Sequence, residues 1–232
     1  MSLVGIIGAM EEEVSQLKEQ MTDVQIKKKA AMEFCRGNLN GKPVVVVRSG
    51  IGKVNAGICA QILVDDYQVD YMINTGIAGS LKNEINIGDI VVSTDTVQHD
   101  MDATGFGYPL GQIPRMDTLS FPADEKLVAL AQEVCREVIP EIQVFAGRVV
   151  SGDQFVSDRA AKERISGNFQ GYCTEMEGAA IAQAAYLNGV PYVVLRAISD
   201  KADDSASVDY PAFEREAIRH SVELMLNMVK RL

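Results

Sequence analysis

Carboxylate side chains at three places in the chain are the residues best suited to acid–base chemistry. The first place is the triplet Glu11-Glu12-Glu13, which follows the apolar run Val4–Gly8. On a helical wheel for residues 10–21, Glu12 points away from the apolar stripe, Glu11 lies near the far edge, and Glu13 borders the stripe. A helix start also favours solvated carboxylates, so the pattern leaves open a solvated triplet or a functional Glu13.

The second place is Glu177, in the helix that we predict over Met176–Leu187, which is apolar nearly all round. Glu177 shares one face of that helix with Ala180 and Ile181. A buried carboxylate must be paired or hydrogen-bonded, because desolvation of a bare charge is costly. A structural ion pair and a hydrogen bond from a ligand hydroxyl both meet this demand, and the second would make Glu177 a binding residue.

The third place is Asp200, which follows the predicted strand Val190–Ser199. Ligands of α/β folds bind beyond the carboxyl ends of buried strands, where a carboxylate can serve as a catalytic acid. Helix N-caps are also found there. Arg196 lies within the same strand and needs a partner, because arginine is rarely buried alone. We therefore expect Arg196 to orient Asp200.

Strand-like and helical segments alternate along the chain, and these elements must position the carboxylates. Runs such as Val44–Val47 and Tyr192–Leu195 are continuously apolar, which is typical of strands covered on both faces. The alternation predicts one α/β domain over residues 1–232, with a mixed or largely parallel sheet between helices. We expect strands at Leu3–Gly8, Phe34–Asn38, Pro43–Ser49, Tyr71–Thr75, Gly88–Val97, Val144–Ser151 and Val190–Ser199, and helices at Met10–Met21, Val54–Val64, Lys126–Val138, Met176–Leu187 and Phe213–Leu232.

Two local signals add detail to this arrangement. Asn40-Gly41 predicts a hairpin between the second and third strands, and Asp65-Asp66 is expected to end the second helix. In open α/β sheets, ligands bind beyond the carboxyl ends of the strands. The expected site is therefore made from the turns that follow apolar strands, at Gly8–Glu13, Ser49–Lys53, Asn74–Gly79, Ser151–Phe155 and Ser199–Asp203.

Composition narrows the class of protein. The chain has 22 basic and 32 acidic residues and a net charge of −10, which disfavours binding to nucleic acid or an anionic membrane. The apolar start is interrupted at Glu11, too early for a secretory signal, and no segment has the length needed to span a bilayer. The four cysteines are scattered without a CxxC pair. We therefore expect free thiols in a cytoplasmic protein.

Several common motifs are absent from the sequence. Ser49-Gly-Ile-Gly-Lys53 lacks the first glycine and the final Ser/Thr of a P-loop, so it is either a tight turn or a glycine turn that approaches a ligand. His99 and His220 are the only histidines, and neither has the spacing of a metal site, so no metal is expected. The chain has no GxSxG elbow for a nucleophilic serine.

Six motifs together resemble those of the 5′-methylthioadenosine/S-adenosylhomocysteine nucleosidases, which belong to the nucleoside phosphorylase superfamily. They are IIGAMEEEV, SGIGKVNA, INTGIAG, VSGDQF, EMEGAAIA and RAISD, and the similarity runs from Val4 to the last helix. The resemblance implies one α/β domain with a central twisted mixed sheet, and a homodimer. It also implies irreversible hydrolysis of an N-glycosidic bond, which releases adenine and a thioribose, without a metal or organic cofactor. Roles in methionine salvage and in removing the product of methyl transfer follow from this activity.

The resemblance also implies roles for individual residues. Glu13 is implied to activate water, Asp200 to protonate adenine N7, and Glu177 to accept hydrogen bonds from the ribose hydroxyls. The remaining residues are implied to contact the substrate: Met176 beside the ribose, Phe155 stacked on the base, the backbone of Val156 at the edge of the base, Met10, Ile51 and Tyr210 around the alkylthio group, and Ile77 and Ser199 in the same site. The segment near Phe106 and Pro114 is implied to complete the site of the other subunit.

Elementary chemistry agrees with these roles. Adenine leaves poorly as an anion, so an acid at N7 with a raised pKa helps departure. An anionic Glu177 stabilises an oxocarbenium-like transition state, and water gains from a base at Glu13. Inverting glycoside hydrolases also use two carboxyl groups, of which one donates a proton to the leaving group and the other accepts a proton from water.

Ile77 departs from the family pattern, because relatives commonly have serine there. The lost hydroxyl puts any help in placing the water in doubt, and it also removes a donor that phosphate would use. Three alternatives stay open: a phosphorylase of the same superfamily, a hydrolase of futalosine-type nucleosides or 5′-deoxyadenosine, and a nucleoside-binding module without catalysis.

Overall fold

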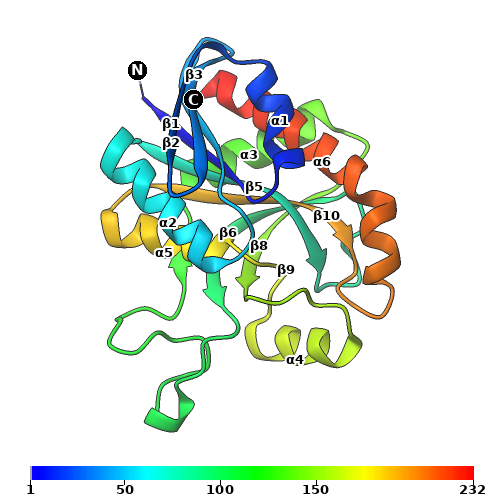
Figure 1. Cartoon of the computed structure of the whole chain (residues 1–232). Coiled ribbons are helices and arrows are strands. Elements are labelled where there is room, and N and C mark those ends of the chain that lie inside the picture. Colours follow the sequence, from blue (N-terminus) through cyan, green and yellow to red (C-terminus); the bar gives the residue numbers. More distant parts are fainter. Residues whose placement is uncertain (1) are drawn as a thin grey trace.

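A computed structural model describes residues 2–232 and joins its ten strands in one mixed sheet (Figure 1). The order is β10-β6-β8-β9-β5-β1-β4-β3-β2, with β7 paired to β6 and β10 also paired to β5. The strands are β1 (Val4–Gly8), β2 (Thr22–Lys29), β3 (Met32–Leu39), β4 (Lys42–Arg48), β5 (Tyr71–Ser80), β6 (Ile90–Gln98), β7 (Phe121–Pro122), β8 (Val144–Ser151), β9 (Cys173–Glu175) and β10 (Tyr192–Asp200). The α/β class that the alternation predicts is confirmed.

The sheet closes on itself at one end. Strands β10, β6, β8, β9 and β5 form a ring, because β10 pairs in parallel with β5 from Met72 to Gly79 while β5 also pairs with β9. Strands β1, β4, β3 and β2 extend from β5 as an open arm. The register shifts between Ile198 and Asp200, so that Ser199 lies at a bulge. This shift places Asp200 opposite Gly79 of β5.

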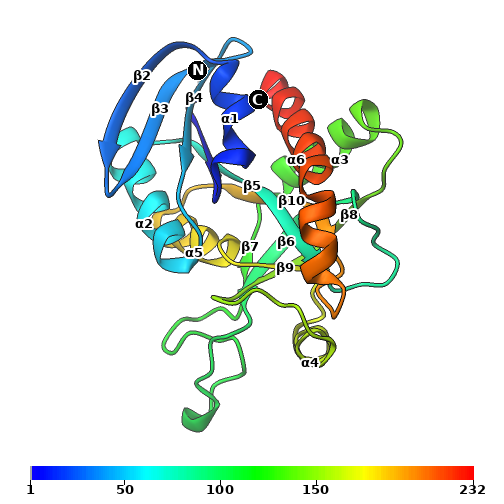
Figure 2. The ribbon, with the colours of Figure 1, turned by 45° about the vertical axis from the view of Figure 1, so that its right-hand side comes forward.

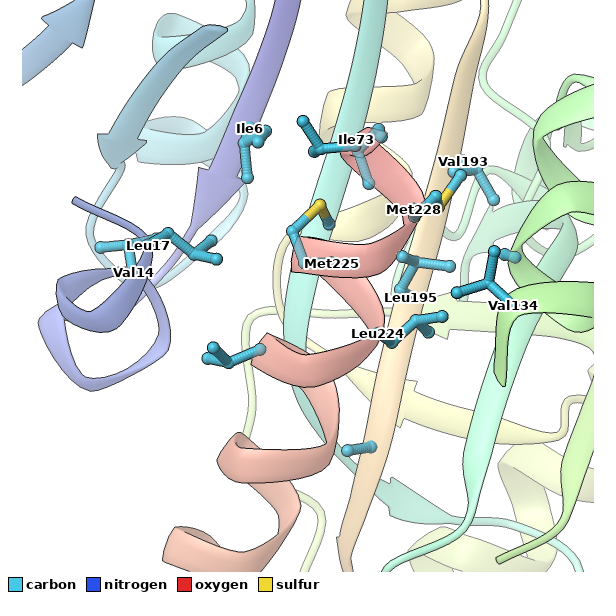
Figure 3. Close-up of a cluster of buried hydrophobic side chains, with 14 of the residues drawn as sticks. Ile6, Val14, Leu17, Ile73, Val134, Val193, Leu195, Leu224, Met225 and Met228 are labelled. Atoms are coloured by element: carbon cyan, nitrogen blue, oxygen red, sulfur yellow. The ribbon is translucent and has the colours of Figure 1, made fainter. Parts of the chain in front are cut away.

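Helices cover both faces of the sheet (Figures 1 and 2). On one side, α1 (Glu11–Glu19), α3 (Glu125–Val138) and α6 (Ala206–Arg231) pack on inward-facing residues of the strands, as Figure 3 shows for part of this core. On the other side lie α2 (Lys53–Ile62) and α5 (Gly178–Asn188), and α4 (Arg159–Phe169) packs on a smaller core. Ile6 faces the first core and Ile7 the second, so continuously apolar strands serve both.

The hairpin expected at Asn40-Gly41 is present. Both residues have positive φ, +51° and +79°, as a type I′ turn between β3 and β4 requires. The same strands pair in register from Phe34 with Val47 to Leu39 with Lys42.

Four element predictions are wrong at their ends. Asp65-Asp66 do not stop the second helix, which continues as a π-helix over Leu63–Tyr67 and ends at Gln68 with φ +52°. Strand β5 continues through the glycines that we expected to form a turn. Helix α5 begins at Gly178, with Glu177 as its N-cap, and α6 includes Pro211 in its second turn.

The pattern also missed β2, α4 and the short strands β7 and β9. Every residue of β2 is exposed, and only Val24 and Ile26 of its sequence TDVQIKKK are apolar, which is too few to mark a strand with a buried face. Helix α6 is 26 residues long but carries many charges, and no helix within residues 2–232 has the length and hydropathy needed to cross a membrane.

The connection between β6 and α3 projects away from the sheet (Figures 1 and 2). It contains a short 3₁₀-helix, Thr104–Phe106, and the side chain of Phe106 is 87% exposed. Pro114 is also exposed. Both residues that sequence resemblance assigns to the partner's site therefore lie on the outside of this subunit.

Met225 of α6 is fully buried between the sheet and α1 and gives a direct test of the larger core. We expect Met225→Ala to lower the free energy of unfolding by about 2–5 kcal/mol, because it leaves a cavity among well-packed side chains. Urea denaturation followed by circular dichroism measures this change. The control is Ile26→Ala at a side chain that is 59% exposed on β2, where we expect a change within about 0.5 kcal/mol. Equal losses in both variants would contradict this packing.

Candidate active site

A cavity of about 450 Å³ opens at the carboxyl ends of the central strands. All five segments that the sequence pattern predicts as site-forming contribute to it, although residues 74–79 belong to β5 and do not form a turn. Its lining residues are Ala9, Met10, Glu13, Ile51, Ile77, Ala78, Gly79, Phe155, Thr174, Glu175, Met176, Glu177, Ser199, Asp200 and Tyr210.

Glu13 is the buried member of the acidic triplet at the start of α1. Its Oε2 accepts hydrogen bonds from the backbone N–H of Ala9 (2.7 Å) and Met10 (2.9 Å), and its Oε1 accepts one from Ile77 (3.2 Å). Glu11 instead pairs with Lys18 at 2.7 Å, and Glu12 is exposed. The helical wheel therefore ranked the three carboxylates correctly, because Glu13 is buried whereas Glu11 and Glu12 are exposed.

Burial raises the pKa of Glu13, while the guanidinium of Arg196 and the three backbone donors act in the opposite direction. The hydrogen bonds fix the carboxylate in place. Burial outweighs their effect on the pKa, so Glu13 takes up a proton at a higher pH than an exposed glutamate does. Glycine at position 76 is required for this placement, because a Cβ there would lie 2.5 Å from Oε1 of Glu13 and 2.7 Å from Nη1 of Arg196.

Asp200 lies at the end of β10 and is buried. Its Oδ2 accepts a hydrogen bond from the Ser199 hydroxyl (2.9 Å), and its Oδ1 accepts one from the backbone N–H of Ala202 (2.8 Å). Burial raises the pKa of Asp200 against the effect of these two donors. The side chain can therefore carry a proton at a pH where an exposed aspartate has lost it.

Glu177 is buried just before α5. Its Oε1 accepts a hydrogen bond from the backbone N–H of Gly52 (2.9 Å), and its Oε2 lies 3.8 Å from Nη2 of Arg196. Burial and the neighbouring Glu175 raise the pKa of Glu177 to about 7. The two interpretations of Glu177, an ion pair within the protein and a ligand-binding residue, are therefore compatible. Its side chain lies near Arg196 and also lines the cavity.

Arg196 does not orient Asp200, so that prediction is wrong. Its side chain is 2% exposed and donates from Nη2 to Asn74 Oδ1 (2.5 Å) and to Glu175, with Glu177 beside it. The guanidinium therefore serves the two glutamates at the start of α5, while Asp200 is held by Ser199 and Ala202.

Glu175 and Asn74 are the polar residues that the sequence interpretation missed. Glu175 accepts hydrogen bonds from the Ser151 hydroxyl and from the backbone N–H of Glu177 (3.1 Å) and Gly178 (2.7 Å), and it pairs with Arg196. The first glutamate of Glu-Met-Glu, placed just before an apolar helix, was an available signal for this anchoring role. The expectation that Arg196 needs a partner pointed correctly to an anion, but it named Asp200 where the structure has Glu175.

Apolar side chains line the outer part of the cavity. Phe155 and Tyr210 meet edge to face, with ring centroids 5.8 Å apart and planes at 84°. Tyr210 donates from its hydroxyl to Glu214 (3.0 Å) and approaches Met10 Sδ (3.5 Å). Ile51 is exposed at the opening. These residues form an apolar entrance above the carboxylates.

The other expected site residues lie at different depths. Met176, Ile77 and Ser199 line the cavity. The side chain of Val156 is buried in the core beneath α4, and Val156 does not line the cavity. Phe106 and Pro114 do not line this subunit's cavity.

The two histidines, His99 and His220, do not line the cavity. Within residues 2–232, no group of three or more His, Cys, Asp or Glu side chains could hold a metal ion. His220 is buried on α6 and contacts the Gly88 carbonyl oxygen at 2.8 Å. Chemically, the arrangement offers a carboxyl with a raised pKa at Asp200 and a fixed acceptor at Glu13 within one cavity.

Comparisons with known proteins cover the whole chain. Residues 3–232 match the family model of the phosphorylase superfamily. The chain is 43% identical over 231 residues to the 5′-methylthioadenosine/S-adenosylhomocysteine nucleosidase of Staphylococcus carnosus, across 99% of this chain and 100% of that protein. It is similar to the solved structure of the Neisseria meningitidis nucleosidase with methylthio-immucillin-A, with TM-score 0.96, 36% identity and full coverage of both chains. It is also similar to futalosine hydrolase of Helicobacter pylori, with TM-score 0.94 and 35% identity over 100% of this chain and 98% of that chain.

The contact at Gly76 generates a stability prediction. We expect Gly76→Ala to lower the free energy of unfolding by about 1–3 kcal/mol, because the new methyl group overlaps with Glu13 and Arg196. The control is Gly167→Ala in α4, where a Cβ meets nothing within 4 Å, and we expect it to be neutral or to stabilise by up to about 1 kcal/mol. Chemical denaturation of both variants measures the difference, and an unchanged Gly76→Ala would show that the carboxylate is free to move.

Proposed function

The chain belongs to the phosphorylase superfamily, and we propose that it hydrolyses the N-glycosidic bond of 5′-methylthioadenosine and S-adenosylhomocysteine. The products are adenine and the corresponding thioribose. The proposal rests on the full-length similarity to nucleosidases and on the chemistry of the cavity lining.

The charge of the lining is the observation that carries hydrolysis rather than phosphorolysis. Four of its side chains are acidic, namely Glu13, Glu175, Glu177 and Asp200, and none of its members within residues 2–232 is lysine or arginine. Phosphate recognition favours arginine and other cationic donors. Water is neutral and enters an acidic cavity without this repulsion. Arg196 lies behind the lining and is already paired with Glu175.

Asp200 is the proposed acid. Its raised pKa favours the protonated form, and transfer of that proton to adenine N7 lets the C1′–N9 electron pair leave on a neutral base. Ser199 holds the orientation of the carboxyl group through its 2.9 Å hydrogen bond. The carboxylate that remains is stabilised by the N–H of Ala202.

Glu13 is the proposed base. A water molecule held by its carboxylate forms the new O–C1′ bond and gives up one proton to Glu13. The N–H groups of Ala9, Met10 and Ile77 fix that carboxylate before the reaction. Ile77 offers the nucleophile no side-chain hydroxyl, so these backbone contacts through Glu13 are the positioning that this proposal relies on.

Glu177 is the proposed ribose ligand. As a carboxylate it accepts hydrogen bonds from the ribose hydroxyls and opposes the positive charge that develops on the sugar. Arg196 and the Gly52 N–H stabilise its ionised form, while Glu175 holds Arg196 in place. Met176 lies next to it in the lining.

The apolar entrance suits a thioether substituent on C5′. Met10, Ile51 and Tyr210 are proposed to surround it, with Phe155 against the base and the Val156 backbone at the base edge. The exposed segment near Phe106 and Pro114 is proposed to complete the site of a second subunit in a homodimer. Methionine salvage and removal of the methyl-transfer product are the proposed cellular roles.

A futalosine-type nucleoside is the second candidate substrate. The similarity to the Helicobacter pylori futalosine hydrolase favours it, because that protein matches this chain over its full length. The acid, base and ribose contacts would serve either substrate, and 5′-deoxyadenosine as well. Only the apolar entrance distinguishes among them.

We expect the protein to release adenine from 5′-methylthioadenosine in phosphate-free buffer. In ¹⁸O-labelled water, the thioribose product should gain one labelled oxygen, which mass spectrometry detects. S-adenosylhomocysteine, 5′-deoxyadenosine and a futalosine-type nucleoside are assayed in parallel. Strict dependence on added phosphate would favour phosphorolysis, and tight binding without adenine release would favour a binding module.

We expect Asp200→Asn to lower kcat by about 10²–10⁴-fold while binding of a non-hydrolysable analogue is retained, because the amide cannot protonate N7. Wild-type activity should fall as the pH rises through the raised pKa of Asp200, since the protonated form is the active one. The variant should lose that dependence. Asp204→Asn, at an exposed residue in the same loop, is the matched control. Unchanged turnover would remove Asp200 from the mechanism.

A further inference from the structure

Three loops that follow strands of the sheet meet at a closed ring of polar contacts beside the cavity. The loops follow β4, β6 and β8; the first leads into α2 at Lys53, and the other two contribute Asp100 and Asp153. We call these contacts the Lys53–Asp100–Asp153 ring. None of the three residues lines the cavity.

The ring closes through both side chains and backbone. Lys53 Nζ donates to Asp100 Oδ1 (2.5 Å), and the Asp153 N–H donates to Asp100 Oδ2 (2.9 Å). The backbone N–H of Lys53 in turn donates to Asp153 Oδ1 (2.8 Å). Lys53 Nζ also reaches Gln98 Oε1 at 3.0 Å.

Backbone hydrogen bonds separate this ring from an ordinary surface ion pair, which is screened by water and contributes roughly 0–1 kcal/mol. The side chains of Lys53 and Asp100 are 17% and 28% exposed, and Asp153 is exposed. A lone pair could also form and break without moving the chain. Here both carboxylates accept from backbone N–H groups, so the ring fixes the paths of two loops relative to each other.

Each of those loops carries a part of the proposed site. Gly52 precedes Lys53, has φ +95°, and donates its N–H to Glu177 at 2.9 Å. A Cβ on Gly52 would lie 3.1 Å from Asp153 Oδ1, so the ring passes directly against it. On the other loop, Phe155 follows Asp153 by two residues and lines the cavity.

We propose that Lys53, Asp100 and Asp153 are positioning residues for the reaction, which hold the Gly52 N–H against Glu177 and thereby keep Glu177 in the ionised form that binds ribose. The inference rests on the function proposed above. Substrate binding and the pH dependence of the reaction would then depend on an ion pair that lies outside the cavity.

The charged groups around Glu177 give the direction of the effect. Glu175, beside it before α5, and Glu13, from α1, raise its pKa, and burial acts the same way. Arg196, from β10, and the Gly52 N–H lower it. A variant that breaks the ring leaves burial, Glu175, Glu13 and Arg196 unchanged. It weakens only the hydrogen bond from the Gly52 N–H to Glu177. The pKa of Glu177 should therefore rise, and the ionised enzyme should be lost at a higher pH.

The test compares Asp100→Asn with the wild-type protein over a range of pH. We expect the acidic limb of kcat/KM for 5′-methylthioadenosine to move up by roughly 0.5–1 pH unit, which is about a three- to tenfold loss on that limb. The loss should appear mainly in KM, and the ratio to wild type should return toward one above the limb. A purely structural defect would lower activity at every pH.

A second readout does not depend on turnover. The ¹³C carboxyl signal of Glu177, assigned with Glu177→Gln, reports the protonation of that side chain by NMR. Its midpoint should rise by the same amount in Asp100→Asn. This measurement also separates the two proposals, because Glu177 would shift even if the protein cleaved none of the nucleosides.

Two further variants complete the design. Lys53→Arg keeps the cation and should restore most of the wild-type profile, whereas Lys53→Met should resemble Asp100→Asn. The matched control is Asp95→Asn, which breaks the partly buried pair with Arg148 (2.7 Å) away from the cavity and should leave the pH profile unchanged. An unmoved Glu177 midpoint in Asp100→Asn, or an equal shift in Asp95→Asn, would overturn the proposal.

Discussion

One buried guanidinium among three glutamates is the constraint on which the site depends. Arg196 meets Glu175 directly, lies near Glu177 and lowers the pKa of Glu13, but a single positive charge cannot neutralise three negative ones. Backbone N–H groups at strand ends and helix starts stabilise the remaining negative charge. Examples are the N–H of Ala9, which donates to Glu13, and the N–H of Gly178, which donates to Glu175. Because desolvated charges need such partners, the carboxylates can occupy this cavity only when the surrounding chain is folded in one arrangement.

The topology of the sheet supplies those donors from distant parts of the sequence. Strand β5 pairs with β10 from Met72 to Gly79, with β1 from Tyr71 to Asn74 and with β9 at Gly79 and Ser80, so the ends of four strands converge on one space. Glycine at positions 76 and 79 lets the acidic side chains cross β5 closely, since a Cβ at Gly79 would lie 2.7 Å from Asp200 Oδ1. The site is thus a property of the strand order rather than of any one loop.

The sequence predicted the α/β class, most of the buried elements and the turns that lead to Glu13 and Asp200, because apolar periodicity reports burial directly. It could not predict β2, which is exposed on every residue, nor where α5 begins. It also gave Arg196 the wrong partner. Periodicity places a side chain on a face, but the choice between Glu175 and Asp200 depends on strand register and on a bulge at Ser199, which local patterns do not encode.

The exposed edge strand β2, at the end of the sheet, has a consequence for solubility. Strand β2 is an edge, and unpaired backbone groups on an edge can recruit a strand from another molecule. Its last three residues are lysines, of which Lys27 and Lys29 share one carboxylate, that of Asp66. A second copy pairing there would bring like charges together and strip them of water. The edge that exposes Val24 and Ile26 is therefore guarded against fibril-like stacking by the lysines that follow them.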